Sequence, residues 1–152
     1  MSTRREMLTR SASVAAALAG LGLLPQAAQA AWSQAAFEAK NMGDLMKALG
    51  TSGPAESKDV TITGPDIAEN GAVVPVGAAS TLPGVKRLLL LVEKNPNMLA
   101  ALFDVTDAVE PNISTRVKMG QSSHVMAVAI TADNKVLFAQ KEIKVTLGGC
   151  GG

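Results

Sequence analysis

The fold is decided by a nine-residue stretch, Val85-Lys86-Arg87-Leu88-Leu89-Leu90-Leu91-Val92-Glu93. After two leading charges, its residues 88–92 are all aliphatic. Short apolar runs bounded by turn residues are typical of buried β-strands. The turn sequence Asn95-Pro96-Asn97 lies one residue further on. We therefore predict a strand over residues 85–93.

Alternating patterns and turns continue on both sides of this strand. Ile113 to Met119 alternates apolar with polar side chains, and Asp133-Asn134 predicts a hairpin turn. The predicted strands are Val60–Thr63, Ala72–Ala79, Val85–Glu93, Leu99–Val105, Ile113–Met119, His124–Thr131 and Val136–Thr146. About seven short strands, with turns about every 8 to 12 residues, predict an all-β, immunoglobulin-like sandwich. The Cys…Trp…Cys pattern of antibody domains is absent, so this assignment rests on the number of strands.

Turn and helix signals complete the predicted domain. Asn70-Gly71 predicts a tight turn, and Pro75 predicts an edge strand or a bulge because it has no N–H to donate. Trp32 to Leu49 has apolar residues at helical spacing and predicts one N-terminal α-helix. Ser33 is its expected N-cap, and Gly50 follows its expected end.

The first 30 residues have the order of a secretory signal: a basic start, a short apolar run and a small-x-small site. A membrane anchor or a buried helix is the alternative, but the apolar run is shorter than the ~20 residues that span a bilayer. Arg4 and Arg5 resemble the paired arginines of a twin-arginine export signal. We expect cleavage between Ala30 and Ala31, export to the periplasm, and a domain over residues 31–147.

Composition narrows the classes of partner. Removing residues 1–30 takes away three of the 14 basic and one of the 13 acidic residues, which leaves a net charge of −1. Nucleic acids and anionic lipids require a basic patch, which nothing here suggests. With 47% hydrophobic residues, leader included, we expect one apolar face to contact another β-domain.

The chain ends Gly148-Gly149-Cys150-Gly151-Gly152 and contains no other cysteine. Glycine adds no bulk, so these residues, the carrier arm, predict a thin and exposed tether. From Val145 to Cys150 the extended reach is ~17 Å. Activated thiols lie beside basic groups, and the sequence neighbours of Cys150 are glycines. We therefore predict a thiol handle that other proteins act on, although an incidental glycine tail is the alternative.

The chain resembles the SoxY family, the Y subunit of the Sox thiosulfate-oxidation carrier. The resemblance is carried by the carrier arm, by residues 68–76, 94–96 and 114–119, and by the twin-arginine leader. It implies that Cys150 holds sulfur covalently on a swinging arm formed by Gly148, Gly149, Gly151 and Gly152. It also implies no catalytic role, no metal and no cofactor besides the bound sulfur.

The resemblance implies four partners. One is a small Z-type subunit that forms a heterodimer with this chain, and three are enzymes that act on the arm. These are a haem-containing oxidase that joins thiosulfate to the thiol, a hydrolase that releases sulfate, and a sulfane dehydrogenase.

Two other candidate sites are weaker. His124 is the single histidine, and a catalytic Cys150–His124 pair would need a rigid nucleophile, so an ordinary surface or core histidine is the better interpretation. Asp104, Asp107 and Glu110 are predicted to lie in one loop, yet they lack the regular oxygen spacing of a calcium site. We expect solvated loop acids.

Methionines and two cations leave further alternatives open. Copper binding is one interpretation of four methionines, but they lie in periodic apolar segments and predict core or partner packing. These are Met42, Met46, Met119 and Met126. Arg116 and Lys118 should point away from Val117 and could steer anionic partners or cargo, although solvated charge is the default.

Three rival functions remain. Ubiquitin-like sulfur carriers also end in Gly-Gly, but they need ATP, from which export would separate this chain. A structural sandwich that dimerises through Cys150 would show a disulfide and no sulfur adducts. An independent thiol enzyme would need activating residues near Cys150.

Overall fold

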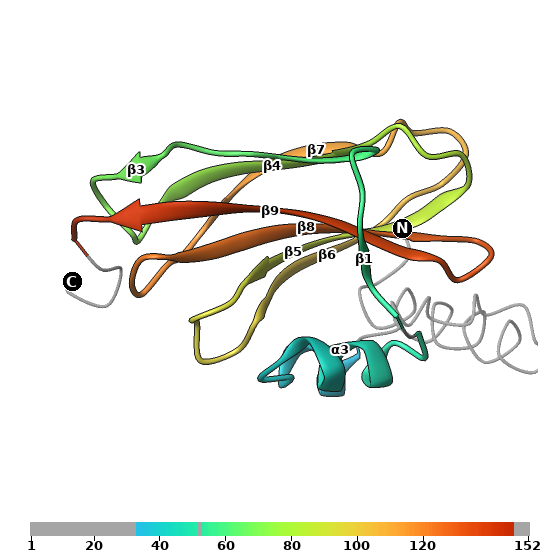
Figure 1. Ribbon diagram of the computed structural model, residues 1–152, viewed down its shortest axis with the longest axis horizontal. Coiled ribbons are helices and arrows are strands. Elements are labelled where there is room, and N and C mark those ends of the chain that lie inside the picture. The colour runs from blue at the N-terminus through green and yellow to red at the C-terminus, as the bar shows by residue number, and fades with distance from the viewer. Residues whose placement is uncertain (1–32, 52, 148–152) are drawn as a thin grey trace, which may run out of the picture. The chain divides into compact units, whose positions relative to one another are not determined.

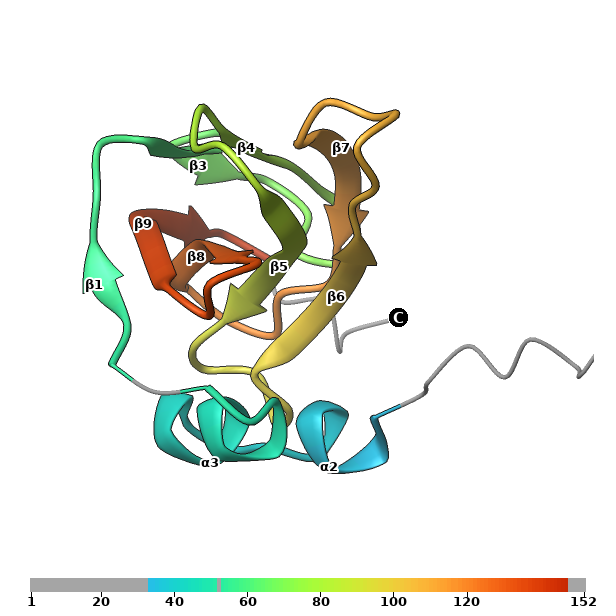
Figure 2. The same cartoon turned by 90° about the vertical axis from the view of Figure 1, so that its right-hand side faces the viewer.

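Nine strands form two packed sheets in the computed structural model, which describes residues 33–51 and 53–147. One sheet faces the other across a buried apolar layer, and two short helices cover the opposite face of the larger sheet (Figures 1 and 2). The all-β sandwich prediction is confirmed. Neither of the described helices is long and apolar enough to span a bilayer.

The larger sheet has the order β1-β9-β8-β5-β6, with β3 also paired to β9. Its long strands, β5, β6, β8 and β9, pair antiparallel, whereas β1 and β3 run parallel to β9. The bounds are β1 Ala55–Glu56, β3 Ile67–Ala68, β5 Val85–Val92, β6 Leu99–Asp104, β8 Ser123–Thr131 and β9 Val136–Val145. The leucine-rich residues 85–92 thus form a central strand, with β8 on one side and β6 on the other.

The smaller sheet contains three antiparallel strands in the order β2-β4-β7. They are β2 Val60–Thr63, β4 Val74–Ser80 and β7 Asn112–Val117. The alternation predicted for residues 113–119 is present, because Val117 and Met119 are buried while Arg116 and Lys118 are exposed.

Successive residues of β5 pack alternately into two hydrophobic cores. Leu88 and Leu90 belong to the cluster between the sheets, whereas Leu89 and Leu91 belong to the cluster beneath the helices. All four leucines have no exposed surface. Full burial of one leucine side chain contributes about 2 kcal/mol, so a strand buried on both faces explains the unbroken leucine run.

The predicted single helix over residues 32–49 is wrong, because the structure has two helices, α2 Gln34–Phe37 and α3 Met42–Ala48. Between them, the backbone carbonyl of Ala39 accepts a 3.1 Å hydrogen bond from the Met98 N–H. Asn41 then caps α3 by accepting from Asp44 N. At the other end Gly50, with φ of 69°, terminates the helix as expected.

Pro75 lies in β4, the middle strand of the smaller sheet, so the predicted edge strand is wrong. Its register partner is Arg116 of β7. On the other side β2 ends at Thr63, opposite Gly77. Pro75 is tolerated because β4 has no neighbour on that side beyond Gly77.

Candidate functional site

Strand β9 brings the chain to one end of the sandwich, where the described residues stop at Leu147 (Figure 1). Cys150 and the glycines of the carrier arm lie outside the described residues, as do the leader, Arg4, Arg5 and the expected cleavage site. The candidate site that the structure describes is therefore the surface from which the arm leaves. We call this surface the collar and define it as residues 66–73, 94–95, 118–122 and 144–147.

One side of the collar is a ladder between residues 66–73 and the end of β9. Lys144 N donates to Asp66 O at 3.0 Å, and Thr146 N donates to Ala68 O at 3.1 Å. The last rung joins Gly71 N to Leu147 O at 2.8 Å. The backbone is thus held in place up to three residues before Cys150.

The Thr146 hydroxyl strengthens this ladder by donating to Glu69 O at 3.0 Å. Inside the turn, Asn70 Oδ1 accepts from Ala72 N at 2.9 Å, which confirms the turn predicted at Asn70-Gly71. Gly71 is buried, and its carbonyl accepts from Met119 N at 2.7 Å. This bond joins the first side of the collar to the second.

The second side is built by polar side chains that bond to backbone. Asn95 Nδ2 donates to Lys118 O at 2.7 Å, and Asn95 Oδ1 accepts from Gly120 N at 3.2 Å. Ser122 Oγ accepts from Val145 N at 2.8 Å, so it replaces a strand partner at the end of β9. Three loops and the end of β9 are therefore cross-linked around Leu147.

The collar brings together the segments that carry the family resemblance. Residues 68–76, 94–96 and 114–119 all meet at or beside it, although up to about 50 residues separate them along the chain. Sequence reasoning treated Asn70 and Asn95 as turn residues and missed their shared location. The sequence signal that could have linked them is an asparagine that precedes a glycine at Asn70 and a proline at Asn95.

An ion pair at Asp66 holds the first residue of the collar against β9. Lys141 Nζ lies 2.8 Å from Asp66 Oδ1 and donates to Gly64 O at 2.7 Å. The hydrogen bond and the charge of Lys141 hold the pKa of the Asp66 carboxyl below its usual value. The pair ties the chain between β2 and β3 to β9.

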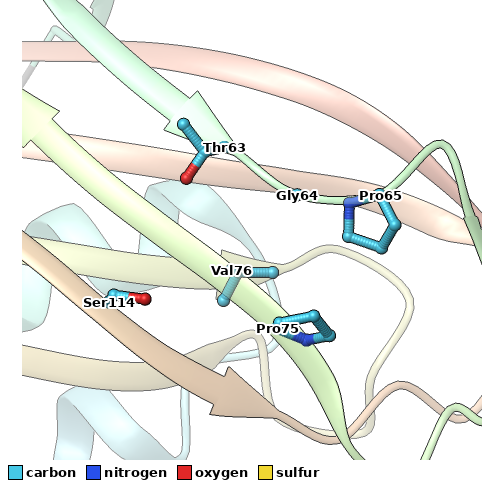
Figure 3. A pocket seen from close by; sticks show the side chains of 6 residues that line it. All are labelled: Thr63, Gly64, Pro65, Pro75, Val76 and Ser114. Carbon is cyan, nitrogen blue, oxygen red and sulfur yellow. The ribbon is translucent and has the colours of Figure 1, made fainter.

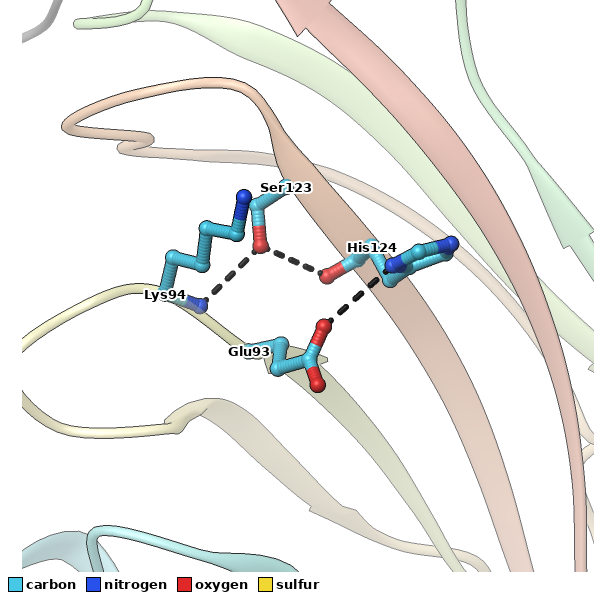
Figure 4. A network of polar contacts seen from close by, with 4 residues as sticks. All are labelled: Glu93, Lys94, Ser123 and His124. Atoms are coloured by element: carbon cyan, nitrogen blue, oxygen red, sulfur yellow. Dashed lines mark hydrogen bonds and ion pairs between the residues drawn. The ribbon is translucent and has the colours of Figure 1, made fainter.

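His124 lies beside the collar in a small polar network (Figure 4). Its Nδ1 is 3.2 Å from Glu93 Oε2. Ser123 Oγ accepts from Lys94 N and donates to His124 O, both at 3.0 Å. His124 is half-exposed and already has a carboxylate partner, so the surface-histidine interpretation is confirmed.

The three acids considered for calcium lie at the opposite end of the sandwich from the collar. Asp104 is part of β6, as the predicted strand Leu99–Val105 requires, and so does not lie in the loop expected for the three acids; it pairs with Arg87 at 2.9 Å. Asp107 pairs with Lys86 at 2.9 Å. Within residues 33–51 and 53–147, no group of three or more His, Cys, Asp or Glu side chains is placed to hold a metal.

The methionines pack in the cores. Met46 and Met126 belong to the cluster beneath the helices, and Met42 packs against it. Met119 lies in the other cluster, between the sheets. Four thioethers divided between two cores do not form a copper site, so the packing interpretation is confirmed.

A cavity of about 300 Å³ opens where β2 ends (Figure 3). It lies beside the part of β4 that has no β2 neighbour, because the β2–β4 pairing ends at Thr63 and Gly77. Its lining offers two hydroxyls and no charged group. The lining residues are Thr63, Gly64, Pro65, Pro75, Val76 and Ser114.

Comparison with solved structures gives a strong match to a sulfur carrier. The structure of the sulfur carrier protein SoxY from Chlorobium limicola f thiosulfatophilum is 31% identical, with a TM-score of 0.62. The match covers 69% of this chain and 94% of that one. Among curated protein sequences no match was found.

A second likeness shows the fold alone. A superoxide reductase (neelaredoxin) from Ignicoccus hospitalis has a TM-score of 0.51 at 18% identity. That match covers 57% of this chain and 79% of the reductase.

The family model described as sulfur oxidation protein SoxY matches residues 45–150, a span from α3 through the whole sandwich to the terminal cysteine. Together with the Chlorobium structure, this match confirms the resemblance that the terminal motif and the collar segments indicated. The chain belongs to the SoxY family of sulfur oxidation proteins.

Proposed function

We propose that this protein carries sulfur intermediates of thiosulfate oxidation on Cys150, in the periplasm, as a substrate of partner enzymes. Its family membership carries this proposal, because a family member of known structure is named a sulfur carrier protein. The collar supports it, since a rigid base around Leu147 is what a short swinging arm needs.

The chemistry proceeds on the thiol in two balanced steps. A haem-containing oxidase joins thiosulfate to Cys150: the thiol sulfur and the sulfane sulfur of thiosulfate form an S–S bond, the thiol proton leaves, and two electrons pass to the oxidase, one at a time. A hydrolase then adds water across the terminal S–S bond. Sulfate and one proton leave, and a persulfide remains on Cys150. A sulfane dehydrogenase oxidises that remaining sulfur.

This chain positions the Cys150 thiol, and its partner enzymes activate that thiol. The nearest basic residue to Cys150 in sequence is Lys144, six residues away. A thiol with the ordinary pKa of ~8.5 is mostly protonated at neutral pH. An inactive thiol is protected from unwanted reactions until an enzyme site supplies the base.

The mature domain works as a heterodimer with a Z-type subunit, and the twin-arginine leader exports the folded pair. The leader, the single cysteine and the family membership support this proposal.

Intact mass analysis tests the proposal. The mature protein with its Z-type partner is incubated with thiosulfate and the oxidase, and adducts are mapped on wild type and on Cys150→Ser. We expect a thiosulfonate adduct on wild type and none on Cys150→Ser. A wild-type sample that yields only a symmetric disulfide dimer would instead favour a structural role.

A further inference from the structure

The Asn70-Gly71 turn carries a chemical reactivity that its place in the collar does not require. Of the six asparagines in the sequence, Asn70 alone is followed by glycine; the others precede methionine, proline, isoleucine or lysine. An asparagine before glycine is the pair most prone to deamidation, because glycine has no side chain to obstruct attack by its own backbone nitrogen. The exposed side chain of Asn70 is also open to water.

Deamidation begins when the Gly71 nitrogen attacks Cγ of the Asn70 side chain. A new N–C bond forms, the C–N bond of the side-chain amide breaks, and ammonia leaves with the proton that the Gly71 nitrogen carried. Water then opens the five-membered succinimide at one of its two carbonyl carbons, which gives aspartate or isoaspartate, and the acid proton passes to ammonia. Water is the one co-reactant, and nothing is oxidised or reduced.

In the folded chain both reacting groups are already engaged. The Gly71 N–H donates to Leu147 O at 2.8 Å, and Gly71 is buried. Asn70 Oδ1 accepts from Ala72 N at 2.9 Å, which holds the side-chain amide toward Ala72. Attack on Cγ therefore requires that the Gly71 N–H leave Leu147 O, and this bond is the last rung of the ladder between residues 66–73 and the end of β9.

We propose that Asn70 is a site of spontaneous deamidation that reacts only while this last rung is open, so that Leu147 protects Asn70 in the closed collar. The rate of the modification is then set by the fraction of molecules in which the end of β9 has opened locally. The inference does not depend on the carrier function, because it uses no group of the carrier arm.

The two products should affect the collar differently. Aspartate keeps a side-chain oxygen for Ala72 N and adds a negative charge next to the exposed Glu69. Isoaspartate routes the backbone through its side-chain carbon, which adds one atom to the chain just before Gly71. The Gly71 N–H then no longer lies opposite Leu147 O, so this product should leave the last rung permanently broken.

Ageing of the full mature chain at mildly alkaline pH, followed by peptide mapping with mass spectrometry, tests the site. The conversion of amide to acid is measured at each asparagine, in buffer and in denaturing urea. The variant is Thr146→Val, which removes the hydroxyl that donates to Glu69 O next to the rung and keeps the backbone ladder. The matched control is Thr61→Val, at an exposed threonine of β2 in the smaller sheet.

We expect Asn70 to deamidate at least about tenfold more slowly in the folded chain than in urea, which corresponds to about 1.4 kcal/mol for opening the rung. Thr146→Val should react about fivefold faster than wild type in buffer, the factor that the loss of one hydrogen bond of about 1 kcal/mol gives. Thr61→Val should react at the wild-type rate. Hydrogen exchange of the Gly71 N–H in wild type, at urea concentrations below unfolding, should rise in proportion to deamidation, and this comparison needs no variant.

Four results would overturn the inference. Equal rates in buffer and in urea would show that the rung gives no protection, and no conversion at Asn70 in urea would show that the pair is not reactive. Equal acceleration in Thr146→Val and Thr61→Val would mean that the reaction proceeds through global unfolding. A deamidation rate that does not follow exchange of the Gly71 N–H would separate the reaction from the opening of the last rung.

Discussion

Asn95 is the side chain whose removal should damage the collar most selectively. Its amide donates to Lys118 O and accepts from Gly120 N, so it joins the loop after β5 to the loop after β7. Asn95→Ala removes both bonds and leaves two backbone groups to find water. At about 1 kcal/mol for each hydrogen bond, the variant should lose about 2 kcal/mol of unfolding free energy.

The assay is urea unfolding of the purified mature domain, followed by circular dichroism. The control is Asn97→Ala in the same loop, which removes one exposed hydrogen bond from Lys40 Nζ. We expect that control to stay within about 0.5 kcal/mol of wild type. If Asn95→Ala is as stable as Asn97→Ala, the two collar bonds contribute nothing, and the collar is not the rigid base described above.

Three further predictions follow from the charges and the termini. Asp66→Asn should reduce stability at pH 7, and this loss should become smaller as the pH falls below 3.8. The lowered folded-state pKa of Asp66 means that its contribution is present above the usual pKa of 3.8 and is lost as pH falls through the folded value; a loss that stays constant with pH in urea titrations contradicts this. Arg4→Lys with Arg5→Lys should block export of the folded protein, and normal periplasmic levels on immunoblots would refute a twin-arginine signal. Gly148→Val with Gly149→Val should abolish turnover by the partner enzymes but not alkylation of the thiol by iodoacetamide, because β-branched side chains thicken and stiffen the arm; full turnover would refute deep insertion.

The strands could be predicted because their pattern is local. Burial on one or both faces leaves period two or an unbroken apolar run, and residues 85–92 and 113–117 show both cases. The split between α2 and α3 could not be predicted in this way. It depends on Met98, which bonds to Ala39 O from 59 residues further along the chain. The two-residue strands β1 and β3 are likewise defined by pairing with β9 and carry no pattern of their own.

The candidate site also has one part that is local in the sequence and one part that is not. The carrier arm lies outside the described residues and stays a prediction, which rests on five consecutive residues of unusual composition. The collar could not be predicted, because its bonds join distant residues: Thr146 to Glu69 across 77 positions, and Gly120 to Asn95 across 25. Turn residues in the sequence indicate where the chain bends. Which turns lie next to each other depends on how the two sheets pack.

In the proposed carrier function, a rigid collar and a short arm would let one thiol serve several enzymes. With its origin fixed at Leu147 and a reach of about 10 Å, the thiol is confined to a sphere of roughly 4,000 Å³. One thiol in that volume corresponds to an effective concentration of up to about 0.4 M for an active site held within that reach, above the millimolar values typical of flexible linkers. An enzyme site then needs little intrinsic affinity for the cargo. In the proposed function, a longer or loosely anchored arm would lose this advantage.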